Sequence, residues 1–138
     1  MADINKIGLL VIEDGRMMLV RKQGLEALIL PGGKIEGSET AEDCLRREIH
    51  EELGENADVD AIAFVDDYED VAASDDPSVH KTLKISLYQG KLIGDPQASS
   101  EIVEFVWLDA KGEISALSPI IRNKILPDLI ERGLLVRH

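Results

Sequence analysis

Cysteine is almost absent from this sequence of 138 residues: Cys44 stands alone, so no disulfide framework can form. A lone thiol is typical of proteins from reducing compartments. No apolar run approaches the roughly 20 residues that a membrane-spanning helix needs. Residues 1–6 also lack the basic segment followed by an apolar one that marks an export signal. These absences predict a cytoplasmic protein with no membrane partner.

Positive charge is scarce as well. Lys and Arg number 15 against 27 Asp and Glu, and the resulting net charge of −12 is spread along the chain. Binding to a nucleic-acid polymer draws on clustered Lys and Arg, so this balance argues against such a partner. Small anions stay open, because a bound divalent cation would reverse the local field. The charge therefore leaves a small-molecule nucleotide as a candidate ligand.

Apolar residues make up 44% of the chain, which suits a single domain over residues 1–138 with a core of ordinary size. Short apolar or alternating segments bounded by turn residues indicate strands. The predicted strands cover residues 6–12, 17–21, 27–30, 61–65, 82–88 and 102–108. Asp14-Gly15 is a strong hairpin-turn signal, whereas the polar segments 69–78 and 90–100 are predicted loops.

Two helices are predicted among these strands. From Thr40 to Leu53 apolar residues recur every four positions, with a capping residue at the start and Gly54 just beyond the end. Residues 120–135 form the second amphipathic segment, with Pro127 as an expected kink or break. Strands on both sides of a central helix, with a helix at the end, predict an α+β domain. We expect an α/β/α sandwich with a mixed β-sheet between helices.

The most specific feature of the sequence runs from Gly33 to Gly54. It fits the pattern Gly, five residues, Glu, seven residues, Arg-Glu, an aliphatic residue, any residue, Glu-Glu, any residue, Gly. All seven specified residues are present: Gly33, Glu39, Arg47, Glu48, Glu51, Glu52 and Gly54. This segment resembles the box of the Nudix hydrolases, and the Pro-Gly-Gly entry and flanking strands fit the same layout. Glu55 departs from the aliphatic residue that usually follows the last glycine.

The glutamates of this segment make chemical sense by themselves. At about 100° per residue, Glu48, Glu51 and Glu52 fall within about a third of the circumference of a helix. Carboxylates so close raise one another's pKa unless a cation joins them. Hard oxygen ligands suit Mg²⁺ or Mn²⁺. An acidic cluster alone is more often a solvated helix face, but the complete pattern favours a metal site.

The resemblance implies which groups bind the cation. The carbonyl of Gly32 is expected as a ligand, with Glu48 and Glu52 as the main side-chain ligands and Glu51 sharing the role. Arg47 can pair along the helix with Glu51 or with Glu39, which would orient the glutamates. Gly32 and Gly33 let the backbone turn sharply beside the cation and the substrate.

The resemblance also implies the reaction, in which water attacks a phosphorus of a nucleoside diphosphate linked to a group X. The general base varies among family members, between a box glutamate and a glutamate from a later loop. Here Glu101 and Glu104 are the later candidates, and Glu101 is preferred because it lies where a loop meets a strand. Arg21 or Lys22, on the strand that leads to the site, could contact phosphate, although a solvated strand end explains them equally well.

Substrate choice is less determined by the sequence. Markers of the ADP-ribose, NADH and coenzyme A subfamilies are absent, so a MutT-like role is favoured, with a (d)NTP or oxidised dNTP hydrolysed to a nucleoside monophosphate and pyrophosphate. Two alternatives stay open: an ADP-ribose or nucleotide-sugar pyrophosphatase, and a catalytically silent domain that senses a nucleotide. The apolar C-terminal helix is compatible with a homodimer.

Overall fold

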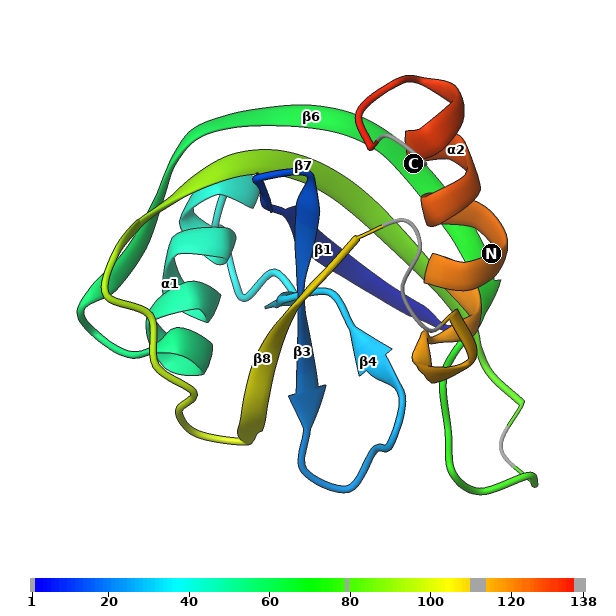
Figure 1. Cartoon of the computed structure of the whole chain (residues 1–138). Coiled ribbons are helices and arrows are strands. Elements are labelled where there is room, and N and C mark those ends of the chain that lie inside the picture. The colour runs from blue at the N-terminus through cyan, green and yellow to red at the C-terminus, as the bar shows by residue number, and fades with distance from the viewer. Residues whose placement is uncertain (1, 79, 110–113, 136–138) are drawn as a thin grey trace.

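The computed structural model describes residues 2–78, 80–109 and 114–135. Two sheets meet at the centre, with α1 (Ala41–Leu53) on one flank and α2 (Leu126–Glu131) on the other (Figure 1). The first sheet has the order β5-β1-β7-β6, and in the second β3 pairs with β2, β4 and β8. This arrangement is the predicted α+β fold with a mixed sheet, because β1 runs parallel to β7 while the other pairs are antiparallel.

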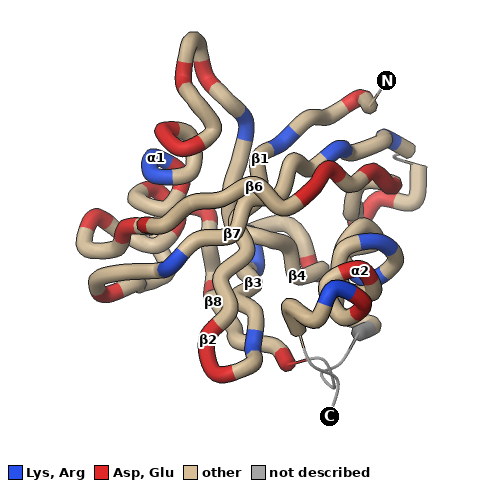
Figure 2. Tube along the Cα trace, turned by 90° about the horizontal axis from the view of Figure 1, so that it is seen from above, with Lys and Arg blue, Asp and Glu red and all other residues tan. Residues whose placement is uncertain are grey.

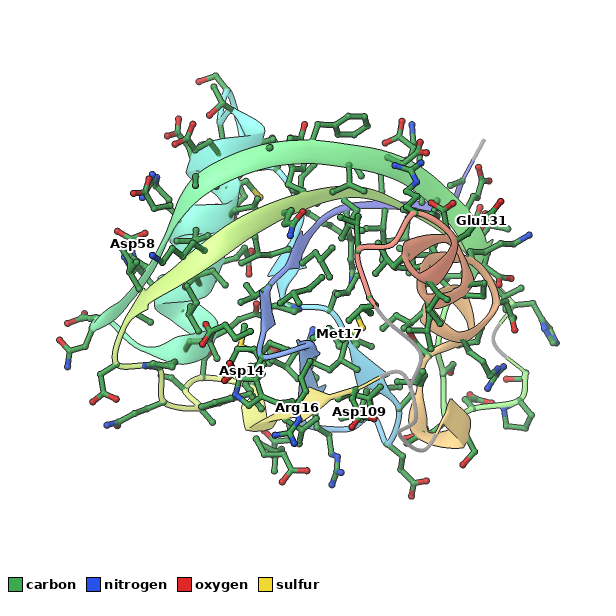
Figure 3. The ribbon with its side chains drawn as sticks, turned by 45° about the horizontal axis from the view of Figure 1, so that its top comes forward. Asp14, Arg16, Met17, Asp58, Asp109 and Glu131 are labelled. Carbon is green, nitrogen blue, oxygen red and sulfur yellow. The ribbon has the colours of Figure 1, made fainter. Side chains whose placement is uncertain are left out.

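The predicted strand over residues 6–12 is divided between the two sheets. Strand β1 (Ile4–Leu10) belongs to the first sheet and β2 (Ile12–Glu13) to the second, so the chain crosses between them at Val11. The predicted hairpin follows, since β2 pairs with β3 (Arg16–Lys22) across Asp14 and Gly15. Both turn residues have positive φ, 54° and 75°, as a type I′ turn requires. Figure 3 shows Asp14, Arg16 and Met17 together at this turn.

Strands β6 (Ala57–Val71) and β7 (Thr82–Gly94) are much longer than predicted. Residues 69–71 and 90–94, predicted as loops, therefore belong to strands. The polar side chains there lie on exposed parts of a long hairpin, which is held together by backbone pairing between β6 and β7. Bulges interrupt this pairing between Asp60 and Ala63 and between Phe64 and Asp66. Strand β8 (Ile102–Leu108) has the predicted bounds, and β4 (Leu28–Ile29) is a shortened form of the predicted run. Gly32–Gly33 forms a two-residue strand, β5, against β1.

The C-terminal helical segment is shorter than the predicted 120–135. A π-helical segment, η2 (Ile121–Ile125), runs directly into α2, so Pro127 lies within a continuous helical stretch, just after its wider turns. The helix ends at Glu131 because Gly133 takes φ 77° and backbone N–H groups fold back onto the last carbonyls. A short 3₁₀ turn, η1 (Ile114–Ala116), lies before it.

Side chains fix this C-terminal segment to β6. The hydroxyl of Tyr68 donates to Asp128 at 2.5 Å, and Arg132 pairs with Asp66 and Asp128. Ile121, Ile125, Leu126 and Leu129 are buried in the core. These apolar side chains, which made a homodimer possible, are therefore packed within the chain's own core.

Acidic residues are distributed over α1, β6, β2 and α2 without gathering on one side (Figure 2). Asp58 near the start of β6 and Glu131 at the end of α2 lie on opposite flanks (Figure 3). Across the described ranges, no helix is long and apolar enough to cross a bilayer.

Candidate functional site

Helix α1 presents its glutamates because its opposite side is held in the core. Thr40 caps the start by accepting from the N–H of Asp43 at 3.1 Å, and Gly54 ends the helix with φ 91°. Leu45, Ile49 and Leu53 are fully buried, which fixes the rotation of the helix about its axis. The departing residue Glu55 is exposed beyond the helix end, so it buries no charge.

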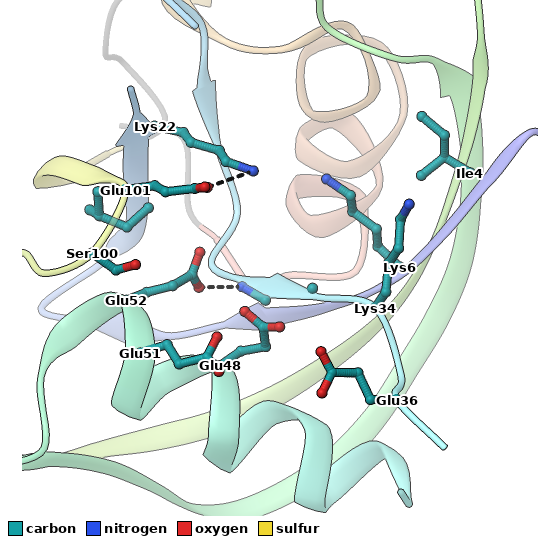
Figure 4. Close-up of a pocket in the computed structure, with 13 residues that line it drawn as sticks. Ile4, Lys6, Lys22, Lys34, Glu36, Glu48, Glu51, Glu52, Ser100 and Glu101 are labelled. Carbon is teal, nitrogen blue, oxygen red and sulfur yellow. Dashed lines mark hydrogen bonds and ion pairs between the residues drawn. The ribbon is translucent and has the colours of Figure 1, made fainter. Parts of the chain in front are cut away.

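The glutamates line a pocket of about 440 Å³, the carboxylate pocket (Figure 4). Glu48, Glu51 and Glu52 approach from α1, and Gly32 and Gly33 of β5 also line the pocket. The full lining is Ile4, Lys6, Lys22, Gly32, Gly33, Lys34, Glu36, Glu48, Glu51, Glu52, Ser100, Glu101 and Ile102. Segments far apart in the sequence thus bring acids and lysines into one concavity.

Glu52 lies deepest of the three glutamates. Its Oε1 accepts the backbone N–H of Gly32 at 2.8 Å. Burial raises the pKa of Glu52 to about 8; the hydrogen bond from Gly32 opposes the rise and the neighbouring Glu48 adds to it. Because burial disfavours the ionised form of Glu52, a bound cation would stabilise its carboxylate strongly.

Glu48 is pressed against the backbone of Gly33. A Cβ on Gly33 would lie 2.4 Å from the carboxyl carbon of Glu48, so a larger residue there would displace this carboxylate from its position. Burial raises the pKa of Glu48, and its bond with Arg47 opposes that rise. The close approach explains why the pattern requires glycine at position 33.

Arg47 joins the box loop to α1. Its guanidinium binds both carboxylate oxygens of Glu39, at 2.7 and 3.0 Å, and donates to the carbonyl of Lys34 at 3.0 Å. It also contacts Glu48 at 2.8 Å and Glu51 at 3.4 Å. Arg47 therefore makes both kinds of pair that the sequence left open, and it positions two of the glutamates.

Replacing Arg47 with lysine should lower kcat by at least about 10-fold, because one ammonium cannot reproduce the bidentate pair and the bonds to Lys34 and Glu48 together. The unfolding temperature should fall as well. Steady-state kinetics and thermal unfolding measure both effects. Arg46→Lys is the matched control, since Arg46 pairs with Glu42 and Asp58 outside the pocket. Equal effects of the two substitutions would contradict the role of Arg47.

The donor set suits a hard divalent cation, since it consists of carboxylates and a glycine carbonyl. Within the described ranges, however, no three acidic, histidine or cysteine side chains already converge as a metal cluster. Glu48 is turned toward Arg47, and Glu52 toward the N–H of Gly32. Metal binding would draw these carboxylates together from nearby positions.

The two predicted phosphate contacts separate in the structure. Lys22 lines the carboxylate pocket and pairs with Glu101 at 3.1 Å. Arg21 instead pairs with Glu104 at 2.8 Å and lines a different surface depression. Of the two later glutamates, only Glu101 therefore reaches the pocket. Ser100 beside it has φ 58°, a strained conformation for a non-glycine residue at the edge of a site.

Sequence reasoning missed Lys6 and Lys34. Lys6 lay in an otherwise apolar predicted strand, and Lys34 occupies a position in the box that the pattern does not specify. A charged residue within a buried apolar strand was the one available signal for Lys6.

A second cavity of about 260 Å³, the aliphatic cavity, adjoins the carboxylate pocket. The two cavities share Ile4, Lys6, Lys22, Gly32 and Glu52. The rest of the lining of the aliphatic cavity is mainly aliphatic: Ile7, Gly8, Leu25, Ile29, Leu30, Ala72, Ala73, Leu83, Ile85, Ser118 and Ile120. Ser118 is 2% exposed, and its hydroxyl has no hydrogen-bond partner in the described part of the chain. An unsatisfied buried hydroxyl costs stability unless a ligand binds it.

Comparisons with known proteins agree with this arrangement. The NUDIX domain model matches residues 5–128. A 62-residue segment, 45% of this chain, is 37% identical to a "MutT-like protein" of Streptomyces ambofaciens and spans 40% of that relative's length.

Solved structures share the fold. The MutT NUDIX hydrolase from Burkholderia pseudomallei aligns with a TM-score of 0.71 at 20% identity, over 91% of this chain and 95% of that chain. The E. coli dihydroneopterin triphosphate pyrophosphohydrolase aligns with a TM-score of 0.66 at 17% identity, over 95% of this chain and 97% of that chain. At such identities these two structures show the common fold alone.

Proposed function

The chain belongs to the Nudix family, and on this premise we propose that it hydrolyses the diphosphate of a nucleoside diphosphate linked to another group. The observation that carries the proposal is the meeting of Glu48, Glu51 and Glu52 with three lysines in one pocket. Carboxylates hold a hard divalent cation, and ammonium groups attract phosphate oxygens. Together they suit a metal–diphosphate, which neither set would accommodate alone.

Glu48, Glu51, Glu52 and the carbonyl of Gly32 are the proposed ligands of Mg²⁺, or of Mn²⁺ in its place. When bound, the cation neutralises phosphate charge and promotes ionisation of water. The chain's own part is to keep the carboxylates within reach. Arg47 does this for Glu48 and Glu51, and the N–H of Gly32 does it for Glu52.

Glu101 is the proposed general base. Its carboxylate pairs with Lys22 at 3.1 Å. An incoming phosphate competes for the Lys22 ammonium, and the released carboxylate accepts a proton from the water that attacks phosphorus. Lys22 and Gly33 thereby serve as substrate-binding residues, while Arg21 is held by Glu104 outside the pocket.

Glu101→Gln should lower kcat by about 10²–10⁴-fold with a smaller change in KM, because the amide still reaches water but cannot take its proton. Glu104→Gln is the control: the same substitution three residues further on, in β8, at a residue that pairs with Arg21 and does not line the pocket. Steady-state kinetics at saturating metal measures both. Activity of Glu101→Gln within twofold of the wild type would assign the base to a box glutamate.

The proposed substrate is a (d)NTP or an oxidised dNTP, cleaved to a nucleoside monophosphate and pyrophosphate. The aliphatic cavity supports this choice: at about 260 Å³ it is smaller than the usual ligand pocket of about 300 Å³ or more, so it suits one ring system. ADP-ribose or nucleotide sugars are the second candidate class, and a silent nucleotide sensor is the third.

A substrate panel tests the proposal. Deoxynucleoside triphosphates, oxidised dNTPs, ADP-ribose, nucleotide sugars and dinucleotides would be incubated with Mg²⁺ or Mn²⁺ and the phosphate products identified. We expect the highest kcat/KM for a triphosphate, with pyrophosphate as product. Preference for ADP-ribose would favour the second class, and no turnover with either metal would favour the sensor.

A further inference from the structure

Lys6 lies at the junction of the two cavities. It is in β1, where Ile7 pairs with Gly33 and Lys6 itself pairs with Ile85 of β7. Its side chain lines both the carboxylate pocket and the aliphatic cavity. Figure 4 shows Lys6, Lys22 and Lys34 on the side of the pocket that faces the glutamates of α1. A ligand that filled both cavities would therefore lie beside Lys6.

Within the described residues, no carboxylate forms an ion pair with Lys6. Throughout residues 2–78, 80–109 and 114–135, no ion pair or side-chain hydrogen bond involves Lys6, although acids outnumber bases in the chain by 27 to 15. Lys22, in contrast, pairs with Glu101. A partly buried ammonium without a partner is unfavourable, which indicates that an anion completes its environment.

Its electrostatic surroundings agree with this interpretation. Burial lowers the pKa of Lys6, and the ammonium groups of Lys22 and Lys34 lower it further, while Glu52 and Glu48 act in the opposite direction. The three lysines thus lie close enough to repel one another. A group with several negative oxygens would turn that repulsion into attraction.

We propose that Lys6 binds the phosphate group that lies nearest the nucleoside and so places the substrate between the two cavities. The inference rests on the proposed function and adds a residue to it. Lys34 lines only the carboxylate pocket, so it would face the outer phosphates. Lys22 forms an ion pair with Glu101. Lys6 is the unpaired lysine that reaches the boundary between the phosphates and the ring.

A structural role for the aliphatic stem of Lys6 predicts something different. The stem packs where aliphatic residues line the second cavity, and methionine would preserve most of that packing. Lys6→Met therefore removes the charge while retaining the apolar stem, and Lys6→Arg retains the charge. Lys84→Met is the matched control, because Lys84 lies on the adjacent strand β7 and pairs with Asp67 outside the pocket.

The test measures three quantities for each variant: KM for the best substrate, the Kd of the nucleoside monophosphate released from that substrate in the presence of Mg²⁺, and the Kd of Mn²⁺ alone. For Lys6→Met we expect KM and the monophosphate Kd to rise about 10- to 100-fold, as for loss of a charge-assisted phosphate contact. The Mn²⁺ Kd should stay equal or fall, because a like charge has been removed. Lys6→Arg should restore most of the affinity, and Lys84→Met should match the wild type.

Three results would overturn the assignment. If the wild type binds the nucleoside monophosphate and Lys6→Met binds it equally well, Lys6 does not bind the phosphate nearest the nucleoside, while the proposed function stands. If Lys6→Met weakens Mn²⁺ and the monophosphate in parallel with a lower unfolding temperature, the residue supports the pocket only structurally. A wild type that neither binds the monophosphate nor hydrolyses any nucleotide would overturn the proposed function and the role of Lys6 with it.

Discussion

Glu52→Gln is expected to lower kcat by at least about 10³-fold, which corresponds to about 4 kcal/mol of transition-state stabilisation. The amide keeps the size of the carboxyl group and its oxygen can still accept the N–H of Gly32, so the loop stays in place. What is lost is the negative charge that would bind the cation. Glu55→Gln, an exposed neutral substitution just beyond α1, is the control and should retain full activity.

The same substitution should stabilise the metal-free protein at alkaline pH. Because burial raises the pKa of Glu52 from 4.5 to about 8, its contribution to stability is complete below pH 4.5 and is lost as the pH rises through 8. Glutamine never ionises, so Glu52→Gln should be more stable than the wild type at pH 8.5 by about 1–3 kcal/mol, and equally stable near pH 4.5.

Urea unfolding in EDTA at the two pH values measures this difference. A Glu52→Gln protein that is less stable than the wild type at pH 8.5 would show that the carboxylate is stabilised by the fold itself. Added Mg²⁺ should reverse the order, because it stabilises only the carboxylate form.

Gly32→Ala is expected to destabilise the fold by more than about 3 kcal/mol. Gly32 has φ 138°, and a Cβ there would lie 2.1 Å from the carbonyl oxygen of Ile7. Relief of that contact would separate β5 from β1 and withdraw the N–H that binds Glu52. Both stability and activity should therefore fall.

Gly37→Ala separates the clash from the cost of positive φ. Gly37 lies in the same loop with φ 56°, and a Cβ there would meet nothing within 4 Å. Its replacement should cost only about 1–2 kcal/mol, the price of a left-handed alanine. Thermal and urea unfolding compare the two variants. A Gly32→Ala protein as stable as the Gly37→Ala protein would show that β5 can move away from β1 without loss of stability.

The elements that the sequence predicted well are those specified by local signals. The bounds of α1 follow from Thr40, Gly54 and the apolar residues between them, which all belong to the helix or its ends. The turn at Asp14-Gly15 follows from the backbone conformation that these two residues adopt. The bounds of β6 and β7 could not be derived in this way. Their ends are polar, and they are strands because each pairs with the other across a distance of many residues.

The residues of the candidate site also fall into two groups, those that local sequence signals predict and those that depend on contacts between distant segments. Glu48, Glu51 and Glu52 share a side of α1 because of helix periodicity, which is visible in the sequence. Which of Arg21 and Lys22 faces the pocket depends on the pairing of β3 with β8, including a register shift between these two residues. Lys6 and Ser118 enter the site only when the two sheets meet, and no spacing in the sequence connects them.

The central claim is that the α1 glutamates hold a divalent cation, and the Kd of Mn²⁺ tests it most directly. Electron paramagnetic resonance of free Mn²⁺ gives this constant for the wild type and for Glu52→Gln at pH 8, with no substrate required. The account predicts saturable binding by the wild type and a Kd at least about 10-fold higher for Glu52→Gln. Equal affinity of the two proteins for Mn²⁺ would contradict it.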